Sequence, residues 1–139
     1  MAKLQQNILI RTDLGFSRGL ISVQVAHIHA EMLRQNILFN NKLVLEPVDG
    51  FEGGTDETFI EWLKDPYIAV LGVPNLETLD HLIAESESAE LVVNKWRDKV
   101  YCEIASDWTL TFDTIVGASV GPADCDDLKM IMGKLPLLQ

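Results

Sequence analysis

The sequence has few cysteines and few basic residues. Two of its 139 residues are cysteine, Cys102 and Cys125, and this number excludes a disulfide framework or a four-cysteine zinc site. The 11 Lys and Arg residues are outnumbered by 21 Asp and Glu residues, which gives a formal net charge of −10. Because Lys and Arg drive phosphate binding, this balance argues against a broad nucleic-acid surface.

Long apolar runs and phosphate-cradling loops are also missing. No apolar stretch approaches the roughly 20 residues that a membrane span requires, and the opening Met-Ala-Lys-Leu-Gln-Gln has no signal-peptide core. The patterns G-x-x-x-x-G-K-[ST] and G-x-G-x-x-G do not occur. With 47% hydrophobic residues, the chain can form one continuous core. We therefore expect a cytoplasmic protein with no membrane anchor and a single domain over residues 1–139.

The spacing of apolar residues predicts strands that alternate with helices. Strands are expected over residues 7–14, 67–73, 91–103 and 112–120, and helices over 20–36, 57–64, 74–88 and 123–133. Strands separated by helices pair in parallel, whereas the two consecutive strands near the end form an antiparallel pair. The predicted fold class is therefore α/β, a small mixed β-sheet of about four strands with helices on both faces.

Two segments of this pattern have special features. Residues 37–55 contain Pro47 and several glycines, so we expect an irregular loop insertion there. Lys95, Arg97 and Lys99 alternate along the strand expected over 91–103 and so share one face of it. Such a row is typical of an exposed edge strand protected by basic side chains, and it is also able to contact phosphates.

Two separated motifs carry a resemblance to a known family. The first is Arg11-Thr12-Asp13-Leu14, followed by Arg18-Gly19 and then Gln24-Val25-Ala26-His27. The second is Thr114-Ile115-Val116-Gly117, followed by Gly121-Pro122-Ala123-Asp124. In this order and context, the sequence resembles the type-2 peptidyl-tRNA hydrolases over nearly the whole chain, with residues 37–55 as the exception.

The resemblance implies a hydrolase that cleaves the ester between a peptide and the 3′ end of tRNA. It also implies a four-stranded mixed sheet, a homodimer, tRNA as partner, and no metal or organic cofactor. The family carries a lysine after the second glycine of its turn, where this sequence has Leu20. The family's D-A-G-x-T signature is absent as well. Thr114 remains as the expected catalytic polar residue, and Asp107 or Glu103 is the expected source of the catalytic carboxylate.

Four further residues are candidates for substrate binding, each with a structural alternative. Asp13 lies at a strand end, where α/β sites usually form, but a turn or cap interaction is equally compatible with this position. Arg18 precedes a helix and is suited to phosphate, and a solvated arginine in a turn is an equally good interpretation. Gln24 and His27 share a helix face with Glu31. His27 is either part of a polar site or a buried histidine that anchors the helix.

Three functional hypotheses stay open at this point. In the first, Thr114 and a nearby carboxylate hydrolyse peptidyl-tRNA. In the second, the fold persists without the chemistry and binds a protein or a small ligand. In the third, a pocket lined by Asp13, His27 and Thr114 acts on another ester or amide.

Overall fold

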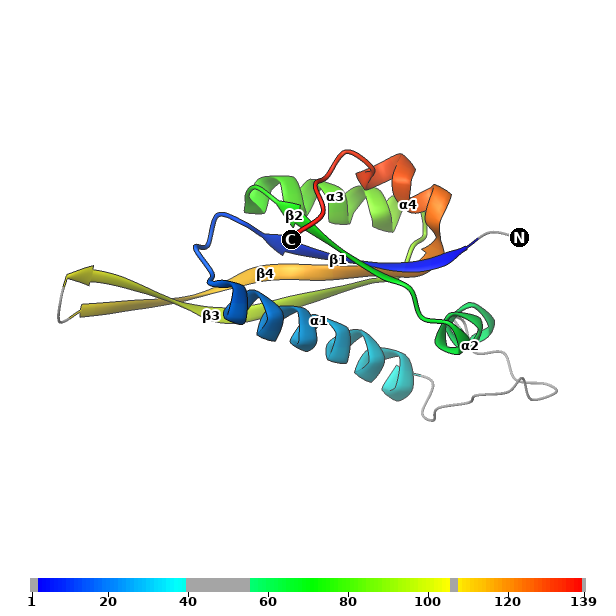
Figure 1. The fold of residues 1–139 in the computed structure, drawn as a ribbon, viewed down its shortest axis with the longest axis horizontal. Helices are drawn as coiled ribbons and strands as arrows, with labels where there is room; N and C mark the ends of the chain where they lie inside the picture. Colours follow the sequence, from blue (N-terminus) through cyan, green and yellow to red (C-terminus); the bar gives the residue numbers. More distant parts are fainter. Residues whose placement is uncertain (1–2, 40–55, 106–107, 139) are drawn as a thin grey trace.

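The computed structural model describes residues 3–39, 56–105 and 108–138, with four strands forming one sheet. They are β1 (Leu4–Arg11), β2 (Ile68–Val73), β3 (Val93–Ala105) and β4 (Trp108–Asp124), in the order β2-β1-β4-β3. β1 pairs in parallel with β2 and antiparallel with β4, and β3 pairs antiparallel with β4. The mixed four-stranded sheet expected from the sequence is confirmed. Figure 1 shows the β3–β4 hairpin projecting beyond the other two strands.

Helices cover both faces of this sheet, as predicted. α1 (Arg18–Phe39) lies on one face and contacts β1, β3 and β4, while α3 (Leu76–Ser88) and α4 (Cys125–Met132) pack on the other (Figure 1). The short α2 (Asp56–Lys64) packs near the end of α1 that is distant from the hairpin. Within the described residues, no helix has the length and apolar character needed to cross a membrane.

The face under α3 and α4 holds the larger apolar core. Leu9 of β1 and Val120 of β4 pack there against Leu79 of α3 and Leu128 of α4, and all four are fully buried. Both α3 and α4 start with a side-chain cap. Asn75 Oδ1 accepts the backbone N–H of Thr78 at 2.8 Å, and Asp124 Oδ1 accepts that of Asp126 at 2.9 Å. These caps satisfy amide groups that would otherwise lack a partner.

The face under α1 has a smaller apolar cluster, made of Ile8, Ile10 and Ile28. Gly117 of β4 allows this close packing. A Cβ atom at that position would overlap the carbonyl oxygen of Leu9 and lie 2.8 Å from Ile28 Cδ1. Any larger residue at position 117 would therefore push α1 off the sheet.

The two edges of the sheet differ in how they are protected. The chain after α4 runs along the outer edge of β2, where Leu138 N–H donates to the Val70 carbonyl and Gly72 N–H to that of Pro136. β3 forms the other edge, as the sequence predicted, and Lys95 and Arg97 are exposed on it. Basic side chains on an edge strand disfavour pairing with another chain.

Several predicted boundaries are wrong. β1 runs over Leu4–Arg11 and not over 7–14, so Asp13 follows the strand instead of ending it. α1 continues to Phe39, which places residues 37–39 in the helix and not in the expected insertion; residues 40–55 lie outside the described residues. β4 extends to Asp124 and shortens the last helix, because residues near both ends of β4 continue the ladders with β1 and β3.

Candidate functional site

Arg11 is the centre of a polar group at the carboxyl end of β1. Its guanidinium binds Asp13 through two bonds, from Nε to Oδ1 at 3.0 Å and from Nη2 to Oδ2 at 2.8 Å. Nη1 donates to Thr114 Oγ1 at 2.8 Å and to the Ile115 carbonyl oxygen at 3.1 Å. Arg11 retains 8% of its exposure and Thr114 retains 9%. The arginine therefore ties the end of β1 to β4 and fixes the threonine hydroxyl.

These bonds set the charge state of the group. Hydrogen bonds from Arg11 hold the pKa of Asp13 below its ordinary value, and they outweigh the opposing effect of burial. Asp13 is thus ionised at neutral pH and offsets the charge of Arg11. Because Thr114 Oγ1 accepts a bond from Arg11, its hydroxyl proton is directed to another acceptor. The threonine is able to donate to a water molecule or to a substrate carbonyl.

A carboxylate lies opposite this threonine on the neighbouring strand. Asp98 of β3 and Thr114 of β4 are register partners, and residues directly opposite each other in an antiparallel pair project from the same face. Gln24 of α1 donates from Nε2 to Asp98 Oδ2 at 3.1 Å, and Gln24 is itself 4% exposed. The helix thereby orients the Asp98 carboxylate on the face that carries Thr114.

The same glutamine also holds an aromatic side chain. Trp96 Nε1 donates to Gln24 Oε1 at 2.9 Å, and Trp96 lies two residues from Asp98 on the same face of β3. His27, one turn after Gln24, stacks on the indole with ring centroids 5.0 Å apart and an angle of 13° between the planes. His27 is exposed, so it is not the buried anchor offered as the alternative interpretation.

The remaining sequence candidates either form no hydrogen bond to this group among the described residues or lie outside the described residues. Arg18 is exposed at the first position of α1, and its carbonyl oxygen accepts a bond from Ser22 Oγ at 3.1 Å. Glu103 pairs with Thr109 in the hairpin, five positions beyond the pair formed by Asp98 and Thr114. At about 3.4 Å per residue, its backbone lies about 17 Å from that pair. Asp107 lies outside the described residues, as does the side chain of Glu103.

Sequence analysis missed three members of the site: Arg11, Trp96 and Asp98. Arg11 was part of the quoted motif, but its role depends on a bond to Thr114, which is 103 positions away. Asp98 lies between Arg97 and Lys99. The alternating basic residues indicated a functional role for the opposite face of the strand, so the face that carries Asp98 was not considered. The one available signal was the i, i+2 spacing of Trp96 and Asp98, which places them together on one face.

The position of Leu20 bears directly on the chemistry. It is 40% exposed and lies one helical turn before Gln24, on nearly the same side of α1. An apolar side chain there supplies no hydrogen-bond donor and no positive charge. The group therefore has a carboxylate, a hydroxyl and an arginine paired to Asp13, but no lysine from this helical position.

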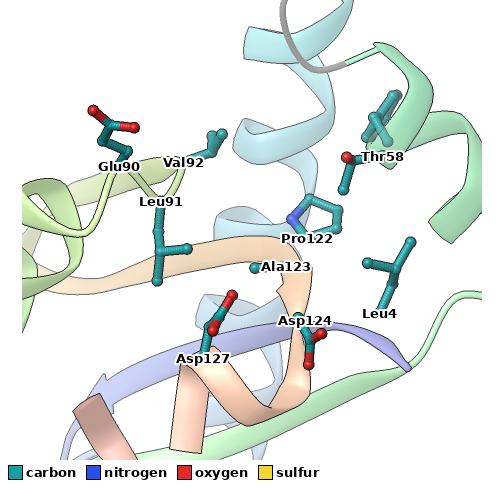
Figure 2. A pocket seen from close by; sticks show the side chains of 10 residues that line it. Leu4, Thr58, Glu90, Leu91, Val92, Pro122, Ala123, Asp124 and Asp127 are labelled. Carbon is teal, nitrogen blue, oxygen red and sulfur yellow. The ribbon is translucent and has the colours of Figure 1, made fainter. Parts of the chain in front are cut away.

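A separate cavity of about 400 Å³ lies at the opposite end of β4 (Figure 2). Leu4, Leu91 and Pro122 form apolar walls, and the carboxylates of Asp124 and Asp127 lie along one side. Gly121 shapes this end of the strand, with φ +106° and a Gln5 carbonyl oxygen 2.7 Å from where a Cβ atom would lie. None of the polar residues around Arg11 lines the cavity, so it is distinct from the candidate site.

The mixed sheet with helices on both faces defines a small α/β fold, and a polar group lies at the end of β1. The family model described as Peptidyl-tRNA hydrolase PTH2 matches residues 4–138. The match covers nearly the whole chain, and the protein belongs to the PTH2 family of peptidyl-tRNA hydrolases.

Proposed function

We propose that this protein hydrolyses the ester between the peptide and the 3′ end of tRNA at the site formed by Asp98 and Thr114. The observation that supports this proposal most directly is the register pairing of these two residues beside the Arg11 guanidinium. Family membership supplies the substrate class. A carboxylate is able to act as a general base toward water, and a hydroxyl is able to donate a hydrogen bond to the ester carbonyl oxygen.

In the proposed reaction, the Asp98 carboxylate accepts a proton as water attacks the ester carbonyl carbon. The Thr114 hydroxyl donates a hydrogen bond to the carbonyl oxygen as negative charge develops on it. When the tetrahedral intermediate collapses, the proton on Asp98 passes to the departing ribose oxygen. Arg11 is a positioning residue because it acts through the threonine that it holds.

This site lacks one source of positive charge. Leu20 occupies the position at which the family carries a lysine, and Asp13 offsets the charge of Arg11. We therefore expect slow turnover, with a neutral hydroxyl as the main donor to the oxyanion. Adding a lysine at position 20 should raise the rate, by up to about 100-fold, because a charged donor stabilises the transition state more than a neutral one.

Single-turnover hydrolysis of an N-acetylaminoacyl-tRNA at low salt tests the proposal. The wild type should cleave it, and Asp98→Asn and Thr114→Val should each slow cleavage by about 10²–10³-fold. Asp113→Asn is the matched control, because Asp113 adjoins Thr114 on the same strand and is exposed. Cleavage that proceeds equally well in Asp98→Asn would contradict the proposed role of this carboxylate.

The second candidate is a domain of the same fold that binds a protein or small ligand without catalysis. The apolar Leu20 and the net charge of −10 favour it, because both weaken contacts with RNA phosphates. Absence of cleavage by the wild type and by Leu20→Lys, together with absence of tRNA binding, would favour this candidate.

Two further expectations stay predictions. We propose a homodimer in the cytoplasm, and sedimentation equilibrium of the full chain would detect the dimer. Asp107 and Glu103 are the carboxylates expected from the sequence, and we propose that Asp98 takes their role, because the Glu103 backbone lies about 17 Å from Thr114. Glu103→Gln and Asp107→Asn should therefore leave the hydrolysis rate unchanged, and a slower rate in either variant would contradict Asp98 as the single base.

A further inference from the structure

The stacked rings of His27 and Trp96 form a flat surface beside the candidate site. Their planes differ by 13° and their centroids lie 5.0 Å apart, and the outward ring, His27, is exposed. Stacked aromatic rings are a common surface for nucleobases, because every base has a π-face.

This ring pair is joined to the proposed base through a single side chain. The Gln24 amide accepts from Trp96 Nε1 at 2.9 Å and donates to Asp98 Oδ2 at 3.1 Å. Trp96 and Asp98 are two residues apart on one face, so their backbone positions are separated by about 7 Å. The ring pair and the carboxylate are therefore held at a fixed distance by one buried glutamine.

The negative net charge of the protein means that binding of RNA needs a contribution other than attraction to phosphates. With a net charge of −10, attraction to phosphates contributes little to binding of an RNA end. Lys95 and Arg97 alternate with Trp96 and Asp98 along β3 and so project from the opposite face. Base stacking does not depend on a basic surface, and it supplies affinity on the face where the carboxylate lies.

We propose that the ring pair formed by His27 and Trp96 binds the base of the 3′-terminal adenosine, whose ribose carries the ester. This inference rests on the proposed function for its substrate. It assigns His27 as the residue that contacts the base and Trp96 as the support beneath it. Gln24 then sets the distance between the bound nucleoside and the Asp98 carboxylate.

The test measures binding of the unesterified trinucleotide CCA, and of the same trinucleotide with an abasic 3′ end, to the full chain. The wild type should bind CCA more tightly than the abasic form by about 5- to 100-fold. His27→Leu keeps the indole covered but removes the aromatic surface, so it should abolish this preference. His27→Phe should retain it, and Val23→Leu, one turn earlier on the exposed side of α1, should not change it.

Equal affinity of the wild type for the two trinucleotides would overturn the proposal, as would a preference that survives in His27→Leu. Because these probes carry no ester, the result is independent of hydrolysis. A base preference without cleavage would leave the ring-pair proposal intact and refute the proposed function. Cleavage without a base preference would do the reverse.

Discussion

The sheet face under α3 and α4 buries mostly apolar side chains, whereas the face under α1 also buries polar ones in hydrogen-bonded groups. On the first face, Leu79 and Leu128 are fully buried against the strands. On the second, Gln6 donates from Nε2 to Ser119 Oγ at 2.8 Å, and its Oε1 lies 2.9 Å from His29 Nδ1. The face under α3 and α4 resembles an ordinary apolar core. The face under α1 holds hydrogen-bonded polar side chains, and the candidate site lies on this same face.

This difference suggests a division of roles between the faces. Buried polar groups add little net stability, but each must keep its partner, so they fix positions more strictly than apolar contacts do. Gln24 illustrates the point, because one buried amide orients both Trp96 and Asp98. The apolar face contributes most of the stability, and the α1 face fixes the positions of the side chains in the candidate site.

The largest effect on stability should come from truncation on the apolar face. Leu79→Ala removes a fully buried side chain between α3 and the sheet, and should lower the free energy of unfolding by about 2–5 kcal/mol. Urea denaturation measures this loss. Hydrolysis per folded molecule should stay at the wild-type level, and a selective loss of activity would contradict the division between the faces.

A smaller loss should follow when the polar group under α1 is broken. Gln6→Met keeps the approximate volume but leaves His29 Nδ1 and Ser119 Oγ without their partner. The unfolding free energy should fall by about 1–3 kcal/mol, since buried polar groups left unpaired keep their desolvation cost. The double variant Gln6→Met, Ser119→Ala should recover part of this loss. If the double variant recovers none of the lost unfolding free energy, the loss in Gln6→Met does not come from the broken bond to Ser119.

The smallest effect should be a pH dependence that arises from His29. Burial lowers its pKa below the ordinary 6.5, so the folded state resists a proton that the unfolded state accepts. The free energy of unfolding therefore has its full value above pH 6.5 and decreases as the pH falls from 6.5 toward the folded pKa, with a slope of at most about 1.4 kcal/mol per pH unit. Urea denaturation between pH 8 and pH 5 measures it. His29→Asn should have a shallower dependence, and an equal slope in both proteins would assign the effect to other groups.

The fold could be predicted from the sequence because local patterns determine most of it. The spacing of Ile28 and Met32 identified the buried side of α1, and both residues are fully buried. Consecutive strands near the end of the chain predicted the antiparallel pair of β3 and β4. Such patterns depend on residues close together in the chain, where helix and strand periods apply.

The site was harder to predict from the sequence, because the register of the strands determines which residues lie opposite each other. The family signature was expected about ten residues before Thr114, whereas the residue opposite Thr114 is Asp98, 16 positions earlier. The long hairpin and a register shift between Trp96 and Arg97 set this pairing. Neither the hairpin length nor an extra residue in one strand follows from the alternation of apolar residues.

The central claim is that Asp98 and Thr114 act together on one ester, and a double-mutant cycle tests it most directly. Single-turnover rates would be measured for the wild type, Asp98→Asn, Thr114→Val and the double variant, with folding verified by urea denaturation. We predict that the double variant is about as slow as the slower single variant, because the two groups serve one transition state. Rate losses that multiply, or a wild type that does not cleave the substrate, would contradict the account.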